Sequence, residues 1–286
     1  MKNVIRSIYL ILAVFFGTAG VGHAADFDNG IAAFDKGDFA GALVQWEPLA
    51  KKGDADAQFN VGLLYEQGKG VPVDGSTKAM DYEIAAQNYV TAMKWYTLAA
   101  AQGHVFAQTN LGAMYDRGAG VLENDKIAVK WYTLAAKQGF AVAQSNLGAM
   151  YDNGEGVEQD YKSGAKWYTL AAEQGYAQAQ TQLGAMYYNG QGVIQDYKTA
   201  MRWFTLAAEK GNGSAQYGLS IMHARGQSVA QDDVYAHMWA NIAASTTDSW
   251  MMAELRDLLA QRMTRSQIEK AHELAQACVA KKYRDC

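Results

Sequence analysis

A repeat of 36 residues is the feature of this sequence that most restricts its fold. Five tryptophans follow one another at that interval: Trp95, Trp131, Trp167, Trp203 and Trp239. Between residues 104 and 211 each copy reads A-Q-x-x-L-G-A-M-Y, then x-x-G-x-G-V, then x-W-[YF]-T-L-A-A-x-[QK]-G. A fixed period of this length indicates an array of small units, in which each unit contacts only its neighbours.

Each copy predicts two helices joined by a turn. In the central copy Leu147, Met150 and Tyr151 have the i, i+3, i+4 spacing of one helical face. Gly154 ends this helix, and a second helix ends at Gly175, because glycine readily adopts the left-handed backbone of a C-cap. One pair is too small to bury its own apolar face. We therefore predict an all-α fold, an α/α solenoid of 36-residue helix–turn–helix repeats with irregular N- and C-terminal caps.

A glycine recurs inside the first helix of each copy, as Gly62, Gly112, Gly148 and Gly184. Glycine inside a helix costs about 1 kcal/mol relative to alanine. Its recurrence predicts that a neighbouring helix approaches closely at this point.

These motifs resemble the Sel-one-like repeat (SLR), a relative of the tetratricopeptide repeat. Its pattern, A-x-x-x-L-G-x-x-Y-x-x-G-x-G-V followed by A-x-x-W-Y-x-x-A-A-x-x-G, is matched closely over residues 104–211 and with departures over most of 26–247. The resemblance implies a protein–protein interaction scaffold that binds a protein or peptide along a concave surface lined by the first helices. Carried onto this chain, the implied contact residues are Asn60, Thr109, Asn110, Ser145, Asn146, Thr181 and Gln182.

The amides among these residues offer both hydrogen-bond donors and acceptors, which suits an extended peptide or an envelope glycan. Solvation of the helix surface, or a hydrogen bond to the neighbouring repeat, explains the same amides without a partner. The sequence leaves these interpretations open.

The N-terminal residues predict export. Residues 1–24 have the pattern of a signal peptide: basic Lys2 and Arg6, an apolar run of about nine residues and a small-residue cleavage site. A run this short is well below the ~20 residues that span a bilayer, so we expect no stable membrane insertion after cleavage and a periplasmic or secreted protein. Residues 25–53 form an irregular capping repeat, in which Trp46 aligns with the column of Tyr96.

The array itself covers residues 54–247 and carries one insertion of 14 residues around 72–86. Fourteen residues is close to four helical turns, so a lengthened second helix, capped by Asp74 or Ser76, keeps its apolar face in register. The insertion is either a contact surface specific to this protein or a tolerated surface addition.

The last segment, residues 248–286, is predicted to be a C-terminal cap of two amphipathic helices, with Thr264 or Ser266 capping the second. Cys278 and Cys286 are the only cysteines, and an exported pair is expected to form a disulfide. Eight residues of unbroken helix separate Cα atoms by about 12 Å, more than the ~7 Å a disulfide allows. The last helix must therefore end near residues 280–282 and the chain must fold back.

Charge and composition restrict the partners. Without residues 1–24 the chain loses two bases and no acids, so its formal charge falls from −4 to −6. This acidity argues against nucleic acid as a partner. Only two prolines and an apolar half of the chain favour one folded helical unit without linkers.

Catalytic motifs are scarce. Ser163 and Lys166 match S-x-x-K, the nucleophile motif of penicillin-interacting enzymes, but Lys166 occupies a column of the repeat and the companion motifs S-D-N and K-T-G are absent. His223 and His237 fall in or beside core columns, where packing is their expected role, and no cofactor or metal motif is found. We predict a protein that is not an enzyme, with a β-lactam- or peptidoglycan-acting envelope enzyme as the alternative.

Overall fold

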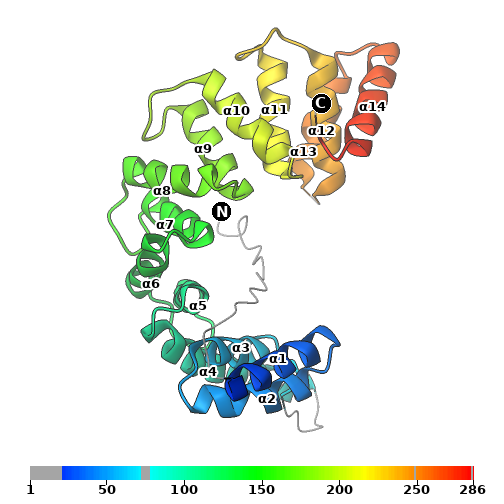
Figure 1. Ribbon diagram of the computed structural model, residues 1–286. Helices are drawn as coiled ribbons and strands as arrows, with labels where there is room; N and C mark the ends of the chain where they lie inside the picture. Colours follow the sequence, from blue (N-terminus) through cyan, green and yellow to red (C-terminus); the bar gives the residue numbers. More distant parts are fainter. Residues whose placement is uncertain (1–20, 72–77, 248, 285) are drawn as a thin grey trace. The chain divides into compact units, whose positions relative to one another are not determined.

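The computed structural model describes residues 21–71, 78–247, 249–284 and 286, with the backbone alone for 21–24 and 78–83. Over these residues it contains fourteen helices and no strand, so the predicted all-α fold is confirmed (Figure 1). The helices form two compact units, Met1–Glu123 and Asn124–Cys286. The expectation of a single undivided unit is therefore wrong. Since each repeat packs only against its neighbours, an array can separate into compact groups between successive helices.

In its described residues the first unit contains five helices, and from α1 to α5 each packs against the next. They are α1 (Val21–Asp35), α2 (Phe39–Lys51), α3 (Ala55–Glu66), α4 (Lys78–Ala101) and α5 (Val105–Arg117).

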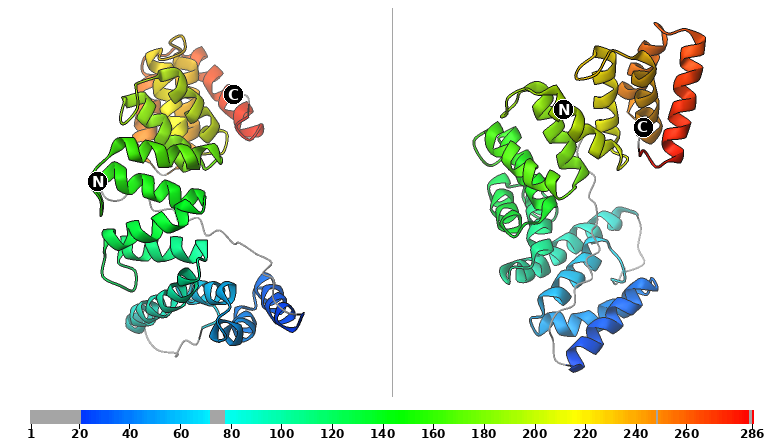
Figure 2. Two further views of the ribbon diagram at one scale, coloured as in Figure 1. Left: turned by 60° about the vertical axis from the view of Figure 1, so that its left-hand side comes forward. Right: turned by 45° about the horizontal axis from the view of Figure 1, so that its top comes forward.

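The second unit contains nine helices in the described residues. From α6 to α13 each helix lies beside the next, and α14 packs against α12 (Figure 2). They are α6 (Asp125–Lys137), α7 (Ala141–Asn153), α8 (Tyr161–Glu173), α9 (Ala177–Asn189), α10 (Tyr197–Ala208), α11 (Gly213–Arg225), α12 (Asp233–Thr246), α13 (Trp250–Ala260) and α14 (Arg265–Ala280).

The helix glycine lies directly beneath an aromatic ring of its own repeat. A Cβ atom added to Gly148 would lie 2.9 Å from Cδ1 of Tyr168, and one added to Gly184 would lie 2.8 Å from Cδ1 of Phe204. Tyr168 is 1% exposed, so its ring has little room to move. The predicted close approach is confirmed, and its cause is the aromatic column of the second helix.

The sixth repeat changes both members of this pair. Ser220 replaces the glycine, and Ala240 replaces the aromatic residue. Without a ring above it, the serine side chain fits, and its Oγ donates a hydrogen bond to the carbonyl of Ala236 at 2.7 Å. The two columns therefore vary together for a steric reason.

The first repeat shows that the irregular N-terminal residues follow the same plan. Trp46 lies 3% exposed over Gly30, where an added Cβ would meet its indole ring, and its Nε1 donates to the carbonyl of Phe27 at 3.1 Å. The alignment of Trp46 with the Tyr96 column is confirmed.

Buried glutamines join successive repeats. The glutamine of each A-Q motif is 4% exposed or less, and its Nε2 donates to the carbonyl eight residues earlier, at the end of the preceding helix. We call these residues the glutamine ladder: Gln58, Gln108, Gln144, Gln180 and Gln216. Gln144 also accepts a hydrogen bond from Gln174 at 2.7 Å, which ties α7 to the end of α8 within the same repeat.

The insertion lengthens the second helix of its repeat, as predicted. Helix α4 has 24 residues, where α6 has 13. The proposed caps Asp74 and Ser76 lie outside the described residues. Most of the predicted signal peptide also lies outside the described residues. Helix α1 begins at Val21, so cleavage after Ala24 would remove the first turn of this helix.

The C-terminal cap agrees with the prediction. Thr264 caps α14 through a reciprocal capping box with Gln267, so Thr264 rather than Ser266 fills that role. Helix α14 ends at Ala280, and Cys278 and Cys286 form a disulfide with Cα atoms 5.3 Å apart. Among the described helices, none is both long and apolar enough to cross a membrane.

Candidate functional site: the amide row

Four amide side chains occupy one position of the repeat, and we call them the amide row: Asn60 in α3, Asn110 in α5, Asn146 in α7 and Gln182 in α9. All four are partly exposed. Two belong to the first unit and two to the second. Each member directly precedes a buried apolar residue and the helix glycine, which are Val61-Gly62 after Asn60 and a Leu-Gly pair after the other three.

The amides of Asn110 and Gln182 are held by tyrosines of the preceding helix. Asn110 hydrogen-bonds the hydroxyl of Tyr96, and Gln182 hydrogen-bonds the hydroxyl of Tyr168. Tyr96 in turn donates its own proton to Oε2 of Glu66 at 2.6 Å. These contacts favour a hydrogen bond to a neighbouring repeat, one of the interpretations left open by the sequence, for these two residues.

Burial keeps these tyrosines protonated. It raises the pKa of Tyr96 well above its ordinary value, and the negative charge of Glu66 raises it further. The pKa of Tyr168 is raised in the same way, by burial and by the charge of Asp152, and burial also raises the pKa of the Asp152 carboxyl. A protonated phenol donates one hydrogen bond and accepts another. An amide that donates to it keeps a second N–H and its carbonyl oxygen for other contacts.

Three predicted contact residues do not reach the surface. Thr109, Ser145 and Thr181 are 4–5% exposed, and the hydroxyls of Thr109 and Thr181 donate to the carbonyls four residues earlier in their own helices. The prediction that they contact a partner is wrong. Each lies one residue, or about 100° around the helix, from the amide row, and that rotation turns it into the helix interface.

The S-x-x-K motif has a structural explanation in the repeat. The hydroxyl of Ser163 donates to Oδ2 of Asp160 at 2.6 Å, and Thr199 makes the same bond to Asp196 one repeat later. Lys166 is exposed on α8. The serine thus belongs to a helix N-terminus that the array repeats. The described residues contain no group of three or more His, Cys, Asp or Glu side chains that could hold a metal ion.

Both core histidines have a lowered pKa. His237 is 2% exposed beside His272, with ring centroids 5.4 Å apart. Burial lowers its pKa, His272 and Arg256 lower it further, and Asp257 opposes them. Burial also lowers the pKa of His223, against the charge of Asp232.

These shifts predict acid sensitivity of the second unit. The unfolded chain takes up protons near pH 6.5, above the lowered pKa values of the folded state. Stability is therefore complete above pH 6.5 and decreases as the pH falls through the folded pKa values. We expect the Tm measured between pH 7.5 and 5.5 to fall with pH, and His237→Gln to reduce that slope. An equal slope in this variant would contradict the prediction.

The second unit also contains a hollow of about 350 Å³, which we call the C-terminal cleft. Helices α10, α11 and α12 and the disulfide-bonded tail contribute Met201, Glu209, His223, Tyr235, Trp239 and Tyr283 to its lining. Sequence reasoning did not predict a site here. The signal was present in His223 and Tyr235, which both depart from the repeat pattern.

Comparison with known proteins identifies the repeats. The Sel1 repeat model matches six consecutive segments, residues 55–82, 84–104, 105–140, 141–176, 177–212 and 213–245. The crystal structure of a Sel1 repeat protein from Oxalobacter formigenes is 29% identical, with a TM-score of 0.73, and the match covers 88% of this chain and 96% of that one.

More distant similarities exist. A sel1 repeat protein from Klebsiella pneumoniae is 20% identical, with 76% of this chain and 99% of that chain covered and a TM-score of 0.45. Helicobacter pylori cysteine rich protein B is 24% identical, with 50% and 97% covered and a TM-score of 0.35. No curated protein matches. Because the repeat model matches well over half of the residues of this chain, the chain belongs to the Sel1 repeat family.

Proposed function

We propose that this protein is an exported interaction scaffold that binds a protein or peptide partner along the first helices of its repeats and performs no chemistry on it. The observation that carries the proposal is the amide row, a partly exposed hydrogen-bonding group at the same position of four repeats. The Cys278–Cys286 disulfide supports export to the periplasm or beyond, since disulfides persist in oxidising compartments.

The tyrosines beneath the row favour binding. In the free protein the hydroxyls of Tyr96 and Tyr168 already hold the amides of Asn110 and Gln182. An amide whose orientation is fixed in advance loses less rotamer freedom when a partner binds, and that loss otherwise costs about 0.5–1.5 kcal/mol per side chain. The remaining N–H and carbonyl suit the alternating donors and acceptors of an extended peptide.

The test is a crosslinking pull-down from the native envelope with the chain lacking residues 1–24. We expect capture of a specific protein partner, and loss of that partner with the Asn110→Ala/Asn146→Ala variant. Asn153→Ala is the matched control, because Asn153 is an exposed amide at the end of α7, outside the row. Circular dichroism checks that each variant keeps its helix content.

Other results would contradict the proposal. A partner retained by the double variant would exclude the amide row as its binding surface. Enrichment of peptidoglycan fragments without any protein would instead support the glycan-binding alternative. Hydrolysis of a β-lactam or of peptidoglycan by the purified protein, abolished by Ser163→Ala, would support the enzyme alternative.

A further inference from the structure

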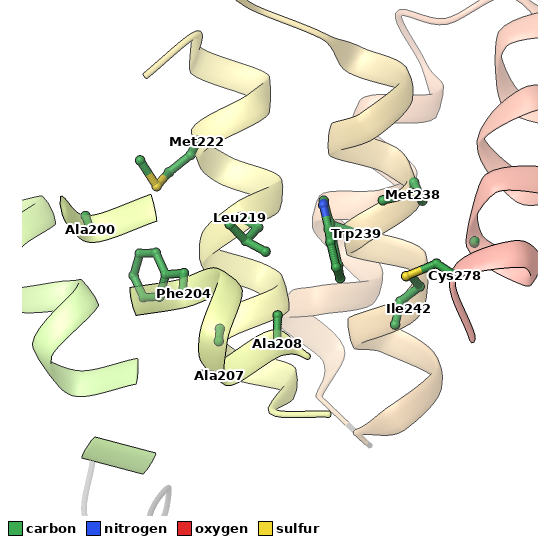
Figure 3. Packing of buried hydrophobic residues seen from close by; sticks show 12 residues of the cluster. Ala200, Phe204, Ala207, Ala208, Leu219, Met222, Met238, Trp239, Ile242 and Cys278 are labelled. Carbon is green, nitrogen blue, oxygen red and sulfur yellow. The ribbon is translucent and has the colours of Figure 1, made fainter. Parts of the chain in front are cut away.

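The C-terminal cleft arises where the sixth repeat departs from the pattern. In four preceding repeats a tyrosine occupies the column of His223, and in the fifth repeat this residue, Tyr187, packs with Trp203 against the local core. The imidazole of His223 is smaller than the phenol it replaces. It leaves space beside Trp239, which lies between α11 and α12 next to Leu219 (Figure 3).

The opposite change occurs on the facing helix. Tyr235 stands in a column that elsewhere holds Ile127, Ser163 and Thr199. Its ring stacks on His223 with centroids 5.4 Å apart and planes 19° from parallel. In the sixth repeat the tyrosine ring is therefore on α12 instead of α11, and it forms an aromatic wall of the cleft.

The disulfide-bonded tail supplies another wall. Tyr283 and Cys286 both line the cleft, and the bond from Cys286 to Cys278 closes the tail against the second unit. Lys282 and Tyr283 have φ values of 54° and 64° in the left-handed region, which turn the chain back after α14. The features of this region that the repeat does not explain, namely His223, Tyr235 and the disulfide loop, thus meet at one cleft.

The lining has the charge of a cation site. Glu209 is its only acidic residue, and none of the described residues that line it is Lys or Arg. Burial lowers the pKa of His223, so its imidazole is neutral at pH 7 and adds no positive charge. The other residues that line the cleft include the aromatic Tyr235, Trp239 and Tyr283 and the thioether-bearing Met201. Aromatic rings with a negative charge recognise alkylated ammonium groups.

We propose that the C-terminal cleft binds a small organic cation with an alkylated ammonium group, of about the size of choline. The cleft volume of about 350 Å³ lies within the usual range of small-molecule sites, about 300–1,000 Å³. The site is separate from the amide row and needs no protein partner. Its walls include the tail that the disulfide holds, so ligand binding depends on the oxidised protein.

The experiment is a choline titration of the purified, oxidised protein, followed by isothermal calorimetry and tryptophan fluorescence. We expect saturable binding that weakens about tenfold with Glu209→Gln. Glu173→Gln, at the same column one repeat earlier and outside the cleft, should bind as the unchanged protein does. His223→Tyr restores the residue of the repeat, fills the cleft and should abolish binding. Reduction of the disulfide should weaken it.

The neutral isostere 3,3-dimethylbutan-1-ol separates charge recognition from simple apolar filling, and it should bind at least about tenfold more weakly than choline. Equal affinity for the two compounds would overturn the proposal. It would also be overturned if choline failed to saturate, or if Glu173→Gln weakened binding as much as Glu209→Gln.

Discussion

Gly148→Val is expected to lower the free energy of unfolding of the second unit by about 2–4 kcal/mol. A Cβ at Gly148 lies 2.9 Å from the ring of Tyr168, which is 1% exposed and packed between helices. The ring or the helix must shift to admit the side chain, and repacking of a filled core is costly. Urea unfolding monitored by circular dichroism measures the change.

The neighbouring residue provides a control for this prediction. Ala149→Val introduces the same branched side chain one residue later, at a partly exposed residue on the border of the core, so we expect a smaller cost of about 1 kcal/mol. The pairing of Ser220 with Ala240 suggests a sharper test. Gly148→Ser should cost less in a Tyr168→Ala background than alone, which a double-mutant cycle measures as coupling. Additive costs would show that the ring is not the obstacle.

Gln144→Met is expected to destabilise the second unit by about 1–2 kcal/mol, although it conserves volume. The change removes the donor to the buried carbonyl of Ala136 and the acceptor for Gln174, and leaves both without that partner. The carbonyl of Ala136 keeps its hydrogen bond from the backbone N–H of Gly139, and the amide of Gln174 keeps the carbonyl of Leu170, so the cost is that of the two lost hydrogen bonds.

Gln178→Met is the matched substitution on α9, where the side chain is partly exposed. We expect it to change the unfolding free energy by less than about 0.5 kcal/mol. If the two variants were equally stable, the buried hydrogen bonds of Gln144 would contribute no more to stability than an exposed glutamine does. Guanidinium unfolding measures both changes. Equal dependence of the unfolding free energy on guanidinium concentration would show that both variants expose the same surface on unfolding.

The residues that could be predicted from the sequence are those whose role depends on local geometry. The spacing of Leu147, Met150 and Tyr151 predicts a helix because periodicity is a property of one segment. The longest Cα–Cα distance that a disulfide allows predicts where α14 ends, because both cysteines lie within one short segment. The role of Gly148 took one more inference. A glycine destabilises a helix, so its recurrence at the same position of every regular repeat predicted that another group packs closely against it.

The residues that could not be predicted depend on which groups meet across helices. Gln144 and Thr109 are polar, so hydropathy places them at the surface, yet both satisfy their hydrogen bonds on backbone carbonyls and lie buried. The tyrosine beneath Asn110 comes from another helix. The cleft could not be predicted because the tail forms one of its walls: His223 and Tyr235 lie on the adjacent helices α11 and α12, but Tyr283 follows α14.

The glutamine ladder bears on how such a chain gains and loses length. Donor and acceptor of each bond lie eight residues apart, on either side of the loop that joins one repeat to the next. Duplication or deletion of any 36 consecutive residues within the regular part recreates that junction with the same partners, wherever the breakpoints fall. The array is therefore tolerant of unequal recombination, and its number of repeats can change in a single genetic event while every buried amide keeps its partner.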